Sequence, residues 1–188
     1  MTRKAALVND IDHILVSEEE LDRIVTEIAA KIDEDYKDCG GSLLLLGILK
    51  GSVVFMADLM KKLTIPVEID FMKVSSYGKD TKTSGRINII LDLQRSNLSS
   101  RDIIIIEDII DSGKTLSYLT EYLKINGARS VKTCTLLDKP SRREVEFVPD
   151  YRGCEVPDEF VVGYGLDYSE KYRALPFVGV LKEEIYRK

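Results

Sequence analysis

The sequence predicts an α/β domain with a mostly parallel, twisted sheet flanked by helices. Short apolar runs rich in leucine and β-branched residues alternate along the chain with segments whose apolar residues recur every three or four positions. Such alternation is typical of parallel strands joined by crossover helices. The chain has 188 residues, of which 44% are hydrophobic, and this is enough for one domain with a sizeable core.

The amino-terminal half of the chain shows one clear helix signal and several strand signals. Ser17 followed by Glu20 forms a capping box, and the apolar residues after it recur at helical spacing. The continuous apolar run over residues 42–49 predicts a strand that is buried on both faces. Residues 75–85 are polar and lack periodicity, so we expect a loop there. The other elements expected in this half are a helix over 52–63 and strands over 67–74 and 86–93.

The carboxyl-terminal half contains the sharpest change of pattern. β-branched residues over 102–107 predict a strand, and leucines at helical spacing between Gly113 and Gly127 predict a helix. Ligands of parallel sheets bind outside the carboxyl ends of the strands, so this strand-to-helix junction is the candidate site. Further strands are expected over 130–137, 160–166 and 177–181.

Composition and charge argue against several classes of protein. A net charge of −5 disfavours a general nucleic-acid binder, which is usually basic. No apolar run approaches the roughly 18 residues of a membrane span, and residues 1–17 lack the apolar stretch of a signal peptide, so we expect a cytoplasmic protein. The three cysteines are scattered, which argues against a disulfide framework or a zinc site. With one histidine, the chemistry must rest mainly on carboxylates, lysines and backbone amides.

Residues 107–115, with the sequence EDIIDSGKT, have the parts of a phosphate site. A helix N-terminus presents unpaired N–H groups and a partial positive charge. Gly113 permits close approach of the backbone, Ser112 and Thr115 supply hydroxyls, and Lys114 adds an amide and a charge. A nucleotide-binding P-loop does not fit, because that pattern needs a glycine where Asp108 stands.

The acids beside this phosphate site indicate a sugar. Ionised carboxylates only accept hydrogen bonds, so Glu107 and Asp108 are suited to the two hydroxyls of a ribose. Asp111 would then face the anomeric carbon and the group joined to it. The alternative is that the acids merely end a strand and cap a helix, which explains neither the adjacent pair nor the Gly-Lys-Thr that follows.

The string resembles the phosphoribosyl pyrophosphate motif of the type I phosphoribosyltransferases. That motif is a hydrophobic strand, two acids, two apolar residues, Asp, Thr or Ser, Gly, a variable residue and Thr. Four further segments resemble the hypoxanthine-guanine branch of the family, and the likeness covers about residues 43–180. These segments are ILKGS (48–52), SSYG (75–78), LLDKP (136–140) and VPDEFVVGYGLDYSEKYR (156–173).

The resemblance implies a fold and a reaction. The fold would be a single phosphoribosyltransferase domain over 1–188, with a lid loop at about 75–85 and a small purine-binding hood. The hood would comprise about 156–188 and the amino-terminal segment. The enzyme would transfer the phosphoribosyl group to hypoxanthine or guanine, with xanthine open, and release pyrophosphate. The partners would be small molecules, without nucleic acid or membrane, and the assembly a homodimer or homotetramer. The alternative is a regulator with this fold that binds RNA or DNA.

The resemblance also implies a role for each matching residue. Asp111 would exchange a proton with the purine, besides lying in the 5′-phosphate site with Ser112, Gly113, Lys114 and Thr115. The purine would be bound by Lys139 through its O6, by Phe160 through stacking, by Val161 through main-chain groups, and by Asp167. Mg²⁺ would be held by Asp167, Glu107 and Asp108, and pyrophosphate by Lys50, Gly51 and Arg173. Ser76 and Tyr77 would belong to the lid.

Two smaller expectations concern the backbone and the surface. In the family the peptide bond that corresponds to Leu49–Lys50 is often cis, which the sequence by itself does not show. Residues 141–147, with two adjacent arginines beside a glutamate, are expected to form a solvated segment.

Overall fold

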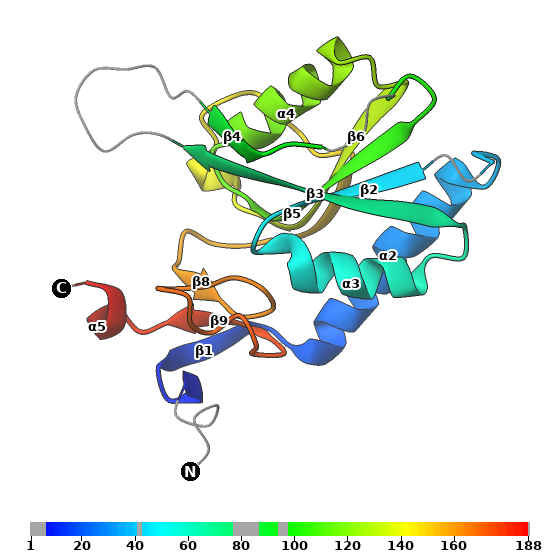
Figure 1. The fold of residues 1–188 in the computed structure, drawn as a ribbon. Helices are drawn as coiled ribbons and strands as arrows, with labels where there is room; N and C mark the ends of the chain where they lie inside the picture. Colours follow the sequence, from blue (N-terminus) through cyan, green and yellow to red (C-terminus); the bar gives the residue numbers. More distant parts are fainter. Residues whose placement is uncertain (1–6, 41–42, 77–86, 94–97, 188) are drawn as a thin grey trace.

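The computed structural model describes residues 7–40, 43–76, 87–93 and 98–187. They form a six-stranded sheet with helices on both faces and, beside it, a separate three-stranded sheet (Figure 1). The predicted α/β class is confirmed. Over the part of the chain described, no helix is both long and apolar enough to cross a bilayer.

The large sheet is parallel except at one edge. Its strand order is β4-β3-β2-β5-β6-β7, and only β3 and β4 pair in antiparallel fashion. The central strand β2 is buried along its whole length, which explains its unbroken apolar run. The strands are β2 (Leu43–Ile48), β3 (Val67–Ser76), β4 (Ile87–Leu91), β5 (Asp102–Ile110), β6 (Ser130–Asp138) and β7 (Tyr151–Glu155).

Alternate residues of the central strands fill two cores on opposite faces of the sheet. Leu43 and Leu45 pack with α2 (Glu18–Tyr36) and α3 (Ser52–Lys62). Leu44 and Leu46 pack with α4 (Lys114–Ile125). This alternation follows from the period of two in a strand. The expected capping box opens α2, because the Ser17 and Glu20 side chains each accept a hydrogen bond from the other residue's backbone N–H.

The small sheet joins the amino-terminal and carboxyl-terminal parts of the chain. We call this sheet, with residues 163–177 between two of its strands and the turn that follows it, the hood. Its order is β1-β9-β8, with antiparallel pairing throughout. Ile11 in β1 pairs with Leu181 in β9. Figure 1 shows the hood next to the edge of the large sheet at which β2 and β5 end. Its elements are β1 (Ile11–Val16), β8 (Val161–Val162), β9 (Val178–Leu181) and the one-turn helix α5 (Glu183–Tyr186).

Several strand expectations need correction. The strand expected over 160–166 ends at Val162, because Gly163 and Gly165 adopt positive φ angles of 98° and 104° and turn the chain. β5 extends three residues further than expected, since Ile109 and Ile110 still pair with β6. β1 and β7 were not predicted. Both are short strands that pair on one side only.

Candidate active site

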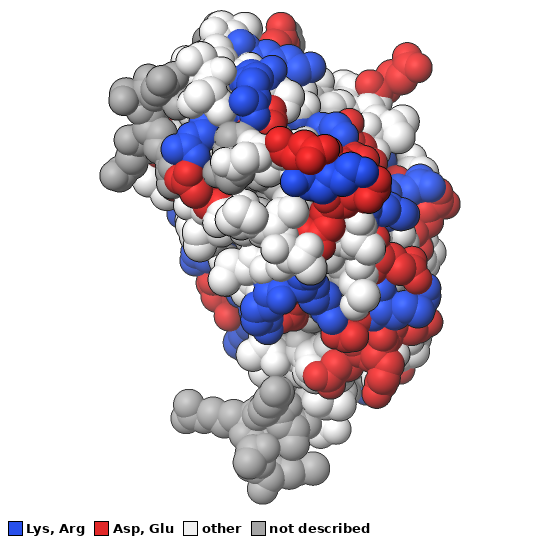
Figure 2. Space-filling view, turned by 90° about the vertical axis from the view of Figure 1, so that its right-hand side faces the viewer, with Lys and Arg blue, Asp and Glu red and all other residues white. Residues whose placement is uncertain are grey.

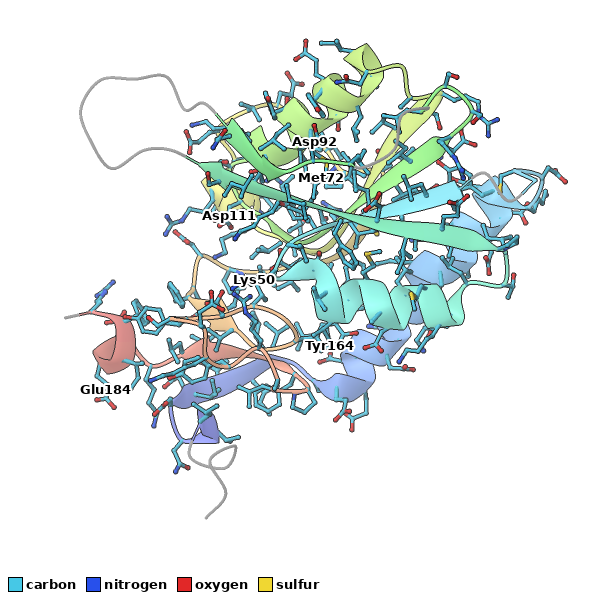
Figure 3. The ribbon with its side chains drawn as sticks, viewed as in Figure 1. Lys50, Met72, Asp92, Asp111, Tyr164 and Glu184 are labelled. Atoms are coloured by element: carbon cyan, nitrogen blue, oxygen red, sulfur yellow. The ribbon has the colours of Figure 1, made fainter. Side chains whose placement is uncertain are left out.

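The carboxyl ends of β2, β5 and β6 meet at the edge of the large sheet that faces the hood. Lys50 follows β2 and Asp111 follows β5, and Figure 3 shows both on this side of the sheet. The topology therefore brings together the segments that the sequence analysis singled out. Their side chains form a phosphate cradle, an acid pair, a turn after β2 and a cavity under the hood.

The phosphate cradle, residues 111–115, is the turn between β5 and α4. Gly113 is the N-cap residue of α4 and has a φ of 80°, a conformation that favours glycine. Lys114 N donates to Ser112 Oγ at 3.3 Å. The N-cap residue Gly113 has no side chain that could accept from the other amides of the first turn of this 12-residue helix, so these amides are available to an anion.

The segment after β6 packs on the cradle, contrary to the expectation that residues 141–147 are merely solvated. A Cβ on Gly113 would lie 3.1 Å from both Arg143 Cδ and Val145 Cγ2. Glu144 N donates to Ser112 O at 3.0 Å, and its carboxylate pairs with Lys114. The segment thus supports the turn that forms the cradle. The expectation that it is merely solvated was wrong.

Arg143 is the residue of this segment that the sequence reasoning missed. Its side chain is only 16% exposed and pairs with Asp138 at the end of β6. It also donates to the backbone oxygen of Asp111. A guanidinium with several donors can bridge a carboxylate and a carbonyl in this way, so Arg143 holds Asp111 in place. Arg143 and Asp111 are 32 residues apart, and a contact between residues so distant in the sequence produces no local pattern that could predict it.

The acid pair, Glu107 and Asp108, is half-buried at the end of β5. Burial first, and then repulsion from Asp108 and Asp111, raises the pKa of Glu107 well above its usual range. Burial is also the largest influence on Asp108 and raises its pKa to about 6, although the Ile109 N–H donates to it and Arg173 favours its charged form. The pair therefore favours a ligand that brings positive charge or hydrogen-bond donors.

The turn after β2 lies directly on Asp108. The Leu49–Lys50 peptide bond is cis, as expected from the resemblance. A Cβ on Gly51 would lie 1.5 Å from Asp108 Oδ2, so any larger residue there would force the turn or the Asp108 carboxylate to move. In the same way a Cβ on Gly165 would lie 2.0 Å from Gly51 O. The turn is thus clamped between β5 and the hood.

The two cations near this turn are held by carboxylates of the hood. Lys50 Nζ donates to Glu170 at 3.1 Å. Arg173 Nη2 lies 2.8 Å from Asp167 Oδ1 and 3.5 Å from Glu170 Oε2. Its Nη1 donates to Gly165 O at 2.7 Å, while its Nε is buried without a partner among the described atoms. Glu170 was not anticipated, because nothing in the sequence near it marks it as a partner of Lys50.

The hood cavity, of about 350 Å³, lies between the cradle and the hood. Lys139 is buried, and its Nζ donates to Glu159 O at 2.9 Å and lies 3.8 Å from Asp111 Oδ1. Phe160 is 36% exposed, whereas Val161 is buried in β8. The residues that line the cavity are Ile109, Asp111, Lys139, Arg142, Asp158, Glu159, Phe160, Val161, Leu166, Tyr186 and Arg187.

The expected lid falls largely outside the described residues. Ser76 is the last residue of β3, and Tyr77 lies in the part of the chain that the structure does not describe. The role expected for these two residues therefore stays a prediction.

A preassembled metal site is not present within the described ranges, where no group of three or more His, Cys, Asp or Glu side chains could hold an ion. The residues nevertheless fit Mg²⁺, which takes oxygen ligands and is usually held by one or two carboxylates plus substrate phosphates. The raised pKa values of Glu107 and Asp108 support this fit, since a bound cation would relieve the repulsion that contributes to them.

Comparison with known proteins points to one family. Residues 15–169 match the phosphoribosyl transferase domain. The chain is 53% identical over 178 residues to a hypoxanthine-guanine phosphoribosyltransferase of Bacillus subtilis, covering 95% of this chain and 97% of that protein. It is also 52% identical to the bifunctional protein TilS/HprT of Listeria monocytogenes, covering 95% of this chain but spanning only 27% of that protein.

The similarity extends to solved structures. A hypoxanthine phosphoribosyltransferase from Staphylococcus aureus superposes with a TM-score of 0.92 at 44% identity, and the alignment covers 100% of both chains. Identity at this level over the whole length indicates a shared family as well as a shared fold.

Proposed function

The chain belongs to the phosphoribosyl transferase family, and from this premise we propose that it is a hypoxanthine-guanine phosphoribosyltransferase of purine salvage. It transfers the 5-phosphoribosyl group of phosphoribosyl pyrophosphate to N9 of hypoxanthine or guanine, giving IMP or GMP and pyrophosphate. One observation carries the proposal: the phosphate cradle and the hood cavity share Asp111, so one ligand can reach both.

The cradle and the acid pair bind the sugar phosphate. The 5′-phosphate accepts hydrogen bonds from the amides of the first turn of α4 and from the hydroxyls of Ser112 and Thr115. Glu107 and Asp108 accept hydrogen bonds from the ribose hydroxyls. Because both its 5′-phosphate and its hydroxyls are bound, the ribose ring is held in one orientation, with C1 facing the cavity.

Pyrophosphate leaves on the side of the turn after β2. The amide of Gly51 and the side chains of Lys50 and Arg173 are its donors. The two side chains exchange their present partners Asp167 and Glu170 for phosphate oxygens. Mg²⁺ held by pyrophosphate oxygens and by Asp167, Glu107 or Asp108 would neutralise the charge that develops on the leaving group.

The purine occupies the hood cavity. The base stacks on Phe160, and main-chain groups of Val161 meet its edge. Lys139 is a donor only, so it favours an oxo group at C6 over the amino group of adenine. Asp111 accepts the proton of N7 as N9 forms the bond to C1 of the ribose. Ser76, at the end of β3, and Tyr77 would take part in a lid that closes over the reacting carbon and excludes water.

The competing proposal, a nucleic-acid-binding regulator, receives no support from the surface charge. Figure 2 shows lysines and arginines interspersed with aspartates and glutamates on the face in view, without a large area of one sign. Nucleic-acid binding would require a basic face. A cytoplasmic location and a homodimeric or homotetrameric assembly accompany the enzymatic proposal as predictions.

Steady-state kinetics with four bases test the proposal. Hypoxanthine and guanine should be converted in the presence of Mg²⁺ and should not be converted after chelation of the metal. Adenine should have a kcat/KM at least about 100-fold lower, because it lacks the oxo group that Lys139 needs. Xanthine tests how wide the substrate range is. If no 6-oxopurine causes phosphoribosyl pyrophosphate to be consumed, the proposed function is wrong.

A further inference from the structure

The helix α5 places an aromatic ring in the hood cavity that has no role in the scheme above. Tyr186 stacks on Phe160, with ring centroids 4.8 Å apart and an angle of 22° between the ring planes. Tyr168 meets Phe160 at 88° and 5.6 Å. The three rings form an aromatic trio, in which Tyr168 and Tyr186 hold Phe160 in position.

The ring of Tyr186 is part of the wall of the cavity, together with Lys139 and Asp111. With Tyr186 in this position the cavity still measures about 350 Å³. Ligand cavities in proteins begin at about 300 Å³, and a purine is a small ligand. The cavity beside Tyr186 is therefore large enough for a purine, so the ring does not fill it.

The turn that carries Tyr186 is attached to the amino-terminal part of the hood. Lys182 N donates to Asp10 O at 3.0 Å, and Lys182 Nζ donates to Asn9 O at 2.7 Å. Ile185 packs against the apolar core of the hood, and Arg187 N donates to Glu183 O at 2.8 Å. These contacts fix the turn, so the ring has a defined place beside Phe160.

We propose that Tyr186 is a positioning residue of the purine site, which orients the Phe160 ring for the base and closes the outer wall of the cavity. The inference rests on the proposed function and adds a residue to its binding site. A ring that is held on one side loses less freedom when a base stacks on it, which favours binding of the base. The phosphate cradle lies at the N-terminus of α4 and shares only Asp111 with the lining of the hood cavity, so binding of phosphoribosyl pyrophosphate should depend little on Tyr186.

The test compares Tyr186→Ala, Tyr186→Leu and Tyr186→Phe with the wild-type enzyme. The alanine variant should raise the KM for hypoxanthine about tenfold, the scale of an aromatic pair, and leave the KM for phosphoribosyl pyrophosphate within about twofold. Tyr186→Leu keeps apolar volume without a ring, so it should show a similar rise and serves if the alanine variant fails to fold. Tyr186→Phe should restore wild-type values, since the contact is made by the ring.

Tyr118→Ala is the matched control, because Tyr118 is also a partly exposed tyrosine stacked on another ring, but it lies on α4 and does not line the hood cavity. It should leave both KM values unchanged. An unchanged or lower KM for hypoxanthine in both Tyr186→Ala and Tyr186→Leu would overturn the proposal, and a lower value would indicate that Tyr186 competes with the base. A wild-type enzyme that converts no purine would instead refute the proposed function itself.

Discussion

The phosphate cradle comes from the consecutive residues 111–115, whereas the wall of the hood cavity beside it comes from segments spread between residues 109 and 187. The cradle is formed by one strand-to-helix turn that belongs to the core sheet. The cavity exists only where β5, the end of β6, β8 and α5 come together. Binding of the sugar phosphate is therefore a local property of the backbone, and binding of the base is a property of tertiary packing.

This difference should be visible in variants. Changes in the cradle or in the turn packed against it should affect phosphoribosyl pyrophosphate, and changes in the cavity should affect the base. Asp111 is the exception, because it belongs to both. We expect the largest effect from a change at Asp111 and the smallest from a change at Asp108 in the acid pair.

Asp111→Asn should have the largest effect, since it removes the proton acceptor and keeps the shape. General-base groups contribute about 10²–10⁴-fold, so kcat should fall by at least about 100-fold. The KM for phosphoribosyl pyrophosphate should stay within about threefold, because the cradle binds through backbone amides. Steady-state rates at saturating hypoxanthine give both values. Wild-type turnover would remove Asp111 from proton transfer and leave the two halves of the site without a shared group.

Gly51→Ala should come next and should act on the phosphate side alone. The new Cβ would lie 1.5 Å from Asp108 Oδ2, so the turn or the acid pair must move. We expect the KM for phosphoribosyl pyrophosphate to rise about tenfold or more, by analogy with other overpacked sites.

Gly127→Ala is the control for this variant, because a Cβ added at Gly127 would have no atom within 4 Å, although the φ of this residue is 88°. It should cost about 1–2 kcal/mol of stability and leave KM unchanged. Equal kinetics for the two variants would show that the turn after β2 does not bind the substrate.

Lys139→Ala should act on the base side alone. The ratio of kcat/KM for hypoxanthine to that for adenine should fall roughly tenfold to a hundredfold, because the donor for O6 is lost. The KM for phosphoribosyl pyrophosphate should change less than about threefold. Lys124→Ala, on the exposed side of α4, is the control. If Lys139→Ala retains its preference for hypoxanthine, the contact to O6 is not what selects the base.

Asp108→Asn should give the smallest effect, which appears in stability. The pKa of Asp108 is raised to about 6 in the folded chain, so the wild-type protein loses stability as the pH rises from about 4 through 6. Without ligand, the variant should therefore melt about 2–6 °C higher than the wild type at pH 8, and the gap should close only at about pH 3.5, below the pKa of an aspartate in the unfolded chain.

Thermal melts at both pH values check this, with the exposed Asp38→Asn as a control that should show no such gap. A variant less stable than the wild type at pH 8 would mean that Asp108 is not strained in the absence of ligand. It would also weaken the case that the acid pair is built for a cation or for hydroxyl donors.

The sequence predicted those parts of the fold and site that depend on neighbouring residues. β2 and β5 are buried on both faces and so appear as continuous apolar runs. The phosphate cradle was predicted from Gly113 and its hydroxyl-bearing neighbours, and the resemblance supplied expected roles for Lys139, Phe160 and Arg173, which the comparisons with known proteins do not test residue by residue.

What the sequence did not predict depends on contacts between distant segments. Arg143 reaches Asp111, Glu170 reaches Lys50, and Tyr186 reaches Phe160. β1 was missed because much of it is exposed and its only partner strand, β9, lies at the other end of the chain. None of these contacts produces a periodic or short-range pattern.

The pairing of β1 with β9 also has a consequence for synthesis. On the ribosome, β1 emerges before every strand of the large sheet and its partner β9 emerges after them, so the nascent chain can complete the large sheet before the hood can form. A chain stopped shortly after β7 would carry the turn that receives the phosphate and lack the strands that frame the purine. The ability to choose a base would thus be acquired only after the large sheet is complete, once β8 and β9 have emerged.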